Sequence, residues 1–138
     1  MLKGVPVVIT SDLLKILDDM GHGDELVVAD ANFPAHSMGR PLVSLKSAKA
    51  TDILSAISGL IDLDTYETPC AMIAVCKGDT LDPAVEEEYR AALKYTGVID
   101  RVERFAFYER SRRAYAIVQT GEMRKYGCVI LKKGCMSA

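Results

Sequence analysis

The chain has 138 residues, of which 49% are hydrophobic and 26% charged, with a net charge of −2. This length predicts a single domain over residues 1–138, large enough to bury about two-thirds of the surface of the unfolded chain. The weak negative charge leaves no basic face, which excludes nucleic acid and anionic membranes as main partners.

The apolar segments and the cysteines indicate the compartment. No run of about 18 apolar residues is present, and residues 1–4 do not resemble the start of a signal peptide. The cysteines form no Cys-x-x-Cys pair and no zinc-type spacing, so we expect reduced, mostly buried thiols in a cytoplasmic protein. They are Cys70, Cys76, Cys128 and Cys135.

The first half of the chain alternates between helix and strand patterns. Apolar residues at helical spacing predict a helix over 12–20, capped by Ser11 and stopped by Gly21. The same spacing predicts a second helix over 52–61, capped by Thr51. Short apolar runs predict strands over 26–29, 41–45 and 71–75.

The second half continues the alternation. Asp82-Pro83 is a strong helix start, and Gly97 is the expected stop. Strands are predicted over 102–105, 115–119 and 129–132, around a polar stretch at 108–113 that is compatible with a helix. The pattern indicates an α/β fold with three layers, α/β/α. The crowded last strands favour a mixed sheet, and the thin helical cover suggests an oligomer.

A histidine and an aspartate flank one predicted strand. Gly21 and Gly23 leave the imidazole of His22 uncrowded, and Asp30 follows the strand directly. The two side chains could serve as acid and base near neutral pH, although they sit at opposite ends of the strand. The alternatives are a surface role for His22 and a turn-forming role for Asp30.

Arg104 lies in the predicted strand 102–105, where it either points to solvent or donates hydrogen bonds to sugar hydroxyls or carboxylates. The chain has no phosphate-binding glycine motif, no metal-ligand set and no Gly-x-Ser-x-Gly elbow. Nothing marks Cys128 as an activated nucleophile. We therefore expect neither a nucleotide cofactor nor a metal.

Several motifs in fixed order carry a resemblance to a known family. They are Met-Gly-His-Gly-Asp-Glu at 20–25, Asp30, Phe-Pro-Ala-His-Ser-Met-Gly at 33–39, Gly-Asp-Thr-Leu-Asp-Pro at 78–83, Arg-Phe-Ala-Phe-Tyr-Glu-Arg at 104–110, Thr-Gly-Glu at 120–122, Lys-Tyr-Gly at 125–127 and Leu-Lys-Lys-Gly at 131–134. Together they resemble the RbsD/FucU family, which comprises D-ribose pyranase and L-fucose mutarotase. The resemblance runs from about residue 2 to 134, and the Phe-Tyr-Glu-Arg segment favours the fucose branch.

The resemblance implies an RbsD-like fold and a role for each matching residue. It implies that His22 is the proton donor, and that Asp30 and Arg104 bind the sugar. The ribose branch has histidine at position 104. The last binding stretch falls on Tyr126-Gly127-Cys128, where the family has Tyr-Gly-Asn. A thiol is a poor substitute for an amide that donates and accepts hydrogen bonds, so this departure puts the sugar preference in question.

The expected function is a cofactor-free isomerase that interconverts the α and β anomers of L-fucose or a related sugar. The resemblance also implies a homo-oligomer, a decamer, with sites formed between subunits. Two alternatives remain at this stage. One is a non-catalytic monosaccharide-binding or regulatory protein of the same fold, to which Cys128 points, and the other is a D-ribose pyranase.

Overall fold

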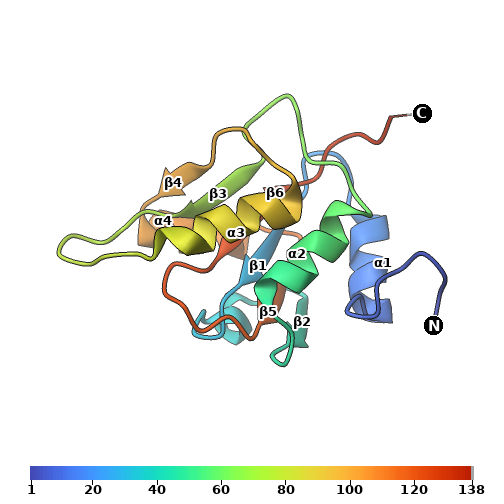
Figure 1. Cartoon of the computed structure of the whole chain (residues 1–138), viewed down its shortest axis with the longest axis horizontal. Helices are drawn as coiled ribbons and strands as arrows, with labels where there is room; N and C mark the ends of the chain where they lie inside the picture. Colours follow the sequence, from blue (N-terminus) through green and yellow to red (C-terminus); the bar gives the residue numbers. More distant parts are fainter. Residues whose placement is uncertain (138) are drawn as a thin grey trace.

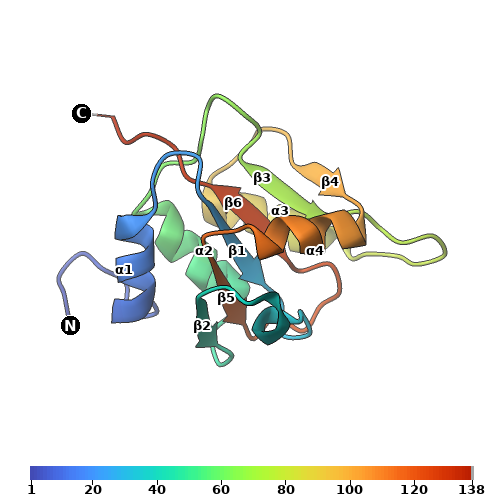
Figure 2. The same ribbon diagram turned by 180° about the vertical axis from the view of Figure 1, so that it is seen from behind.

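We describe the protein from a computed structural model, which describes residues 1–137. One sheet of six strands lies between helices (Figures 1 and 2). The elements in chain order are α1 (Ser11–Asp19), β1 (Glu25–Ala29), the 3-10 helix η1 (Ala35–Met38), β2 (Leu42–Leu45), α2 (Ala50–Ser58), β3 (Cys70–Ile73), α3 (Pro83–Leu93), β4 (Asp100–Val102), α4 (Arg104–Arg112), β5 (Ala116–Thr120) and β6 (Val129–Lys132).

The sheet is mixed, as predicted, and its strand order is β2-β5-β1-β6-β3-β4. β1 pairs in parallel with β5, β5 with β2, and β3 with β4. β6 is antiparallel to both of its neighbours, β1 and β3. Five described strands therefore share one direction, and β6 runs against them in the middle of the sheet.

Helices cover both faces of the sheet, which confirms the predicted α/β fold. α2 and α3 cover one face, with α1 beside them (Figure 1), and α4 and η1 cover the other (Figure 2). Alternate residues of β1 enter the two cores because side chains of a strand point to opposite faces. Leu26 and Val28 belong to the core under α1, α2 and α3, and Val27 and Ala29 to the core under α4.

The first two helices begin earlier than predicted. Thr10, not Ser11, caps α1, and its hydroxyl accepts a backbone N–H of the first turn at 3.3 Å. The cap residue of α2 is Lys49, which makes no side-chain cap bond, so the prediction for Thr51 was wrong. Ala50 is fully buried, and packing of that residue extends the helix beyond the hydroxyl pattern.

The start of α3 is confirmed, but its end is not. The Asp82 carboxylate accepts the Ala84 N–H at 2.9 Å, with Pro83 in the first turn. Lys94 takes a left-handed conformation with φ of 53° and ends the helix before Gly97. Gly97 therefore lies in the loop that leads to β4.

Of the predicted strand 102–105, only Val102 lies in a strand. β4 ends at Val102, and Arg104 is the first residue of α4. The reason is the Glu103 carboxylate, which accepts the N–H groups of Phe105 and Ala106 at 3.0 Å each and caps the new helix. The polar stretch 108–113 falls largely within that helix, as its composition allowed.

The four cysteines differ in their exposure. Within residues 1–137 all four thiols are free; Cys70 and Cys128 are buried, whereas Cys76 and Cys135 are exposed. The prediction of mostly buried thiols therefore holds for two of the four.

None of the helices in residues 1–137 has the length and apolar composition needed to cross a bilayer.

Candidate functional site

Strand direction brings one group of polar residues to a single edge of the sheet. Asp30 follows β1, and Arg104 comes two residues after β4. The stretch Tyr126-Gly127-Cys128 precedes β6, which is antiparallel, so it lies at the same edge. Ligands of open α/β sheets bind at the carboxyl ends of parallel strands, and this edge is the candidate site.

A cavity of about 260 Å³ opens at this edge, slightly below the usual range for small-ligand sites. It is lined by Asp30, Asn32, Phe33, Ile73, Cys76, Asp79, Arg104, Tyr108, Lys125, Tyr126 and Cys128. Four of the six residues predicted from the sequence therefore line one cavity. They are Asp30, Arg104, Tyr126 and Cys128.

Asp30 is the most buried carboxylate of the cavity, with 8% of its surface exposed. Its Oδ1 accepts the Asn32 N–H at 3.0 Å, and its own N–H points at the Cys128 sulfur at 3.3 Å. Burial raises the pKa of the Asp30 carboxyl, while hydrogen bonds from backbone N–H groups oppose that shift. The carboxylate is thus a stronger base than an exposed one.

Tyr126 and Asp79 form another polar part of the cavity lining. The Tyr126 hydroxyl donates to Asp79 Oδ2 at 2.7 Å and accepts the Cys76 N–H at 3.1 Å. This hydroxyl, followed by the Thr80 N–H and the Lys125 ammonium, lowers the pKa of Asp79 to about 2. Asp79 is therefore anionic at neutral pH and fixes the orientation of the phenol.

Removal of the Tyr126 hydroxyl tests this arrangement. In Tyr126→Phe the pKa of Asp79 should rise from about 2 toward the usual value, because the strongest bond to the carboxylate is lost. A carboxyl-carbon NMR titration measures this pKa, with Tyr115→Phe as control, since Tyr115 does not line the cavity. A pKa of about 2 that persists in Tyr126→Phe would contradict the assignment.

Arg104 presents its guanidinium beside two aromatic rings at the cavity wall. Its carbon Cζ lies 5.3 Å from the ring centre of Phe105 and 5.4 Å from that of Tyr108. Its Nε donates to the Tyr108 hydroxyl at 3.2 Å. A guanidinium carries five N–H donors, so donors remain for a ligand with several hydroxyls. The first turn of α4, not a strand, positions this group.

Gly127 and Cys128 pack against Asp30. A Cβ on Gly127 would lie 2.9 Å from Glu122 Cγ and 3.3 Å from Asp30 Cβ, so glycine is needed for close packing against Asp30. Gly127 is not among the residues that line the cavity. Cys128 is 1% exposed, and burial raises the pKa of its thiol well above the usual value. The thiol is therefore neutral and unsuited to attack as a nucleophile.

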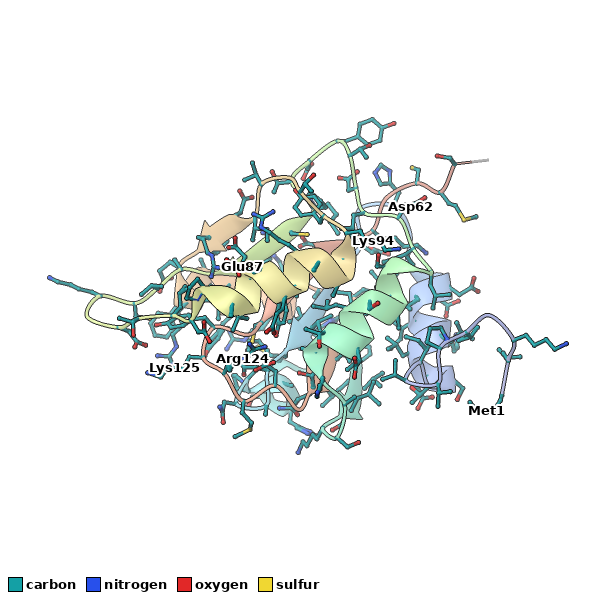
Figure 3. All side chains as sticks on the ribbon, viewed as in Figure 1. Met1, Asp62, Glu87, Lys94, Arg124 and Lys125 are labelled. Atoms are coloured by element: carbon teal, nitrogen blue, oxygen red, sulfur yellow. The ribbon has the colours of Figure 1, made fainter. Side chains whose placement is uncertain are left out.

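His22 lies away from this cavity. It precedes β1, whereas Asp30 follows it, and five strand residues span about 16 Å. Lys125 at the cavity rim and Asp62 near the His22 side are widely separated in Figure 3. Within one chain, His22 and Asp30 therefore do not contact the same small ligand.

Of the two glycines that flank His22, only Gly23 has a backbone conformation that favours glycine. Gly23 has a φ of +89° and donates its N–H to the Lys133 carbonyl at 2.9 Å. The partner of the imidazole is Asp64, whose Oδ1 lies 3.0 Å from Nε2. Asp24 instead accepts the Gly21 N–H at 2.8 Å and shapes the turn.

Sequence reasoning assigned no role to several residues that the fold brings to the two sites. Asp79 stood inside the quoted Gly-Asp-Thr-Leu-Asp-Pro motif, and Tyr108 inside the Phe-Tyr-Glu-Arg segment, so each had a recognisable motif. Asp64 carried none, because its contact with His22 spans 42 residues of sequence.

The whole chain resembles proteins of known family. The model of the RbsD / FucU transport protein family matches residues 3–136. The chain belongs to this family. The resemblance inferred from the sequence motifs is thereby confirmed.

Relatives in the family are similar over their full length. An L-fucose mutarotase of Actinobacillus pleuropneumoniae serotype 5b (strain L20) is 51% identical over 139 residues, which covers 97% of this chain and 96% of the relative. The structure of the fucose mutarotase of Streptococcus pneumoniae in complex with L-fucose is 40% identical, with a TM-score of 0.92. It covers 99% of this chain and 100% of that one.

A more distant solved structure is that of a ribose-binding relative. RbsD of Bacillus subtilis complexed with D-ribose has a TM-score of 0.76 and 22% identity, and covers 99% of this chain and 100% of that one. At this identity the likeness shows the shared fold, which agrees with the RbsD-like fold expected from the sequence.

Proposed function

We propose that this protein is an L-fucose mutarotase, an isomerase that interconverts the α and β anomers of the sugar. The observation that carries the proposal is the 51% identity over 97% of the chain to a protein of that name. The cavity supports it, because a carboxylate, a guanidinium and a phenol converge there on a space suited to a monosaccharide.

The reaction needs two proton transfers. Opening of the pyranose ring requires a proton on the ring oxygen and removal of the proton from the anomeric hydroxyl; after the carbonyl rotates, closure reverses both. Asp30 removes the anomeric proton, and its burial makes it a suitable base. His22 delivers the proton to the ring oxygen. Arg104 and Tyr126 hold the other hydroxyls, and the scheme uses no metal or cofactor.

His22 reaches the sugar from a neighbouring subunit in this proposal. The side chain of His22 is 43% exposed and the adjacent Tyr66 is 79% exposed, so both can enter a contact with another copy. The cavity with Asp30 lies at the opposite edge of the sheet, so a head-to-tail contact joins the two halves of the site. We propose a homodecamer, the assembly that the family resemblance implies, located in the cytoplasm.

The two alternatives make different predictions from this site. A D-ribose pyranase should prefer the histidine of the ribose branch at position 104, where this chain has arginine. A non-catalytic monosaccharide-binding protein has no need of an acid and a base. The pairing of Asp30 in the cavity with an available His22 favours the enzyme.

Saturation-transfer NMR on anomeric protons tests the proposal. With L-fucose, irradiation of the α signal should reduce the β signal in the presence of protein far more than in buffer alone. D-ribose and D-glucose serve as comparison sugars in the same experiment. Binding of L-fucose without faster exchange would support the non-catalytic alternative, and faster exchange of D-ribose alone would support the pyranase.

Restoring the family asparagine tests the role of Cys128. Cys128 is 1% exposed, and its sulfur already accepts the Asp30 N–H. We therefore expect Cys128→Asn to change the affinity for L-fucose by less than the roughly 0.5–1.5 kcal/mol of a net hydrogen bond. Titration calorimetry on the two proteins measures the difference. A larger gain in affinity would show that the side chain contacts the sugar and that this chain is adapted to another one.

A further inference from the structure

A buried carboxylate lies behind His22. Asp64 is 5% exposed, in the segment between α2 and β3. Its Oδ1 lies 3.0 Å from His22 Nε2, and the Tyr66 ring packs against the imidazole with a centroid distance of 5.3 Å. The family motifs quoted from the sequence include His22 but not this carboxylate.

We propose that Asp64 is a positioning residue that holds His22 in the Nε2–H tautomer and leaves Nδ1 as the ring atom that meets the sugar. The inference rests on the proposed function, in which His22 donates a proton. It identifies Nδ1 as the ring atom that transfers the proton and Asp64 as the group that fixes the tautomer.

The carboxylate of Asp64 is fixed by the backbone around it. Its Oδ1 accepts the Tyr66 N–H and its Oδ2 the Glu67 N–H, each at 3.2 Å, so the turn orients both oxygens. The Asp64 N–H in turn donates to the Lys132 carbonyl at 3.0 Å. The acceptor for the imidazole is therefore held by the sheet and does not depend on His22.

The donor in the pair follows from the chemistry of the partners. An ionised carboxylate only accepts hydrogen bonds, and the hydrogen bond from His22 lowers the pKa of Asp64, which keeps it ionised. Nε2 must then carry the hydrogen. In a neutral imidazole the other nitrogen, Nδ1, is an acceptor.

The second nitrogen is available for the reaction. Among the hydrogen bonds of residues 1–137, none uses His22 Nδ1, and the side chain is 43% exposed. In the imidazolium form Nδ1–H donates its proton to the sugar ring oxygen, which leaves the Nε2–H tautomer that Asp64 favours. Ring closure returns the proton to Nδ1. A carboxylate that holds a catalytic imidazole in one tautomer acts in the same way in serine proteases.

The test is the tautomer of His22 in protein labelled with ¹⁵N-histidine. The chain contains two histidines, so His36, which is exposed, is a reference in the same spectrum. Long-range ¹H–¹⁵N correlation should show a protonated Nε2 and an unprotonated Nδ1 at His22 in the wild type. In Asp64→Ala and Asp64→Leu the Nε2–H fraction should fall toward that of His36, because neither side chain accepts a hydrogen bond. Asp64→Leu preserves the shape of the side chain if Asp64→Ala fails to fold.

Anomer exchange supplies the second readout. Exchange of L-fucose should fall about tenfold to a hundredfold in the Asp64 variants, as for other residues that orient a reacting ligand. Asp62→Asn is the matched control, because Asp62 is an exposed aspartate two residues away, and it should leave tautomer and exchange unchanged.

Three outcomes overturn the inference. They are an Nδ1–H tautomer in the wild type, an unchanged tautomer in the folded Asp64 variants, and a loss of exchange without a change of tautomer. If the wild type exchanges no anomers, the proposed function fails, whereas the tautomer comparison still decides the role of Asp64.

Discussion

His22→Ala should lower the rate of L-fucose anomer exchange by about 10²- to 10⁴-fold, the usual contribution of a general acid. The fold should persist, because the His22 side chain is 43% exposed. The hydrogen bond from the Gly23 N–H to the Lys133 carbonyl, which holds this turn, does not involve that side chain. Saturation transfer measures the exchange, and circular dichroism checks the fold.

The other histidine provides the control for this substitution. His36 lies exposed in η1 and does not line the cavity. His36→Ala should exchange the anomers at the wild-type rate. A His22→Ala protein that exchanged L-fucose as fast as the wild type would remove His22 from the mechanism.

Asp30→Asn should lower anomer exchange by roughly tenfold to more than a hundredfold. A hydrogen bond to a charged group contributes about 1.5–3 kcal/mol, and the variant loses both this charge and the base. The amide oxygen can still accept the Asn32 N–H that Asp30 now accepts at 3.0 Å, so the loop after β1 should keep its shape.

Saturation transfer and titration calorimetry with L-fucose separate the two contributions of Asp30. We expect the exchange rate to fall more than the affinity, because proton transfer requires the carboxylate. Asp12→Asn, on the exposed side of α1, is the control for loss of one negative charge. Equal exchange rates in Asp30→Asn and Asp12→Asn would exclude Asp30 as the base.

Part of the site could be predicted from sequence because strand ends are readable from local patterns. The strand at 26–29 was predicted nearly to the residue, and Asp30 at its end lines the cavity. Arg104 was placed in the wrong element, since the Glu103 cap outweighs the apolar pattern around it. It nevertheless reaches the cavity, because both a strand end and the helix start after β4 lie at the same edge.

The remainder depended on topology, which local patterns do not encode. Tyr126 lines the same cavity as Asp30 only because β6 runs antiparallel between β1 and β3. His22 precedes β1 and therefore lies at the opposite edge, where the segment before β3 brings Asp64 to it across 42 residues. Local sequence patterns therefore indicate candidate residues more readily than they indicate which of those residues lie together.

Mixed oligomers test the central claim, that His22 of one subunit acts on the sugar held by Asp30 of the next. His22→Ala and Asp30→Asn chains, each nearly inactive alone, are co-expressed with different tags, and oligomers that carry both tags are purified. Random assembly into a head-to-tail ring gives about one site in four with both native residues, so about a quarter of the wild-type exchange rate should return. Mixed oligomers no more active than the two separate variants would contradict a site shared between subunits.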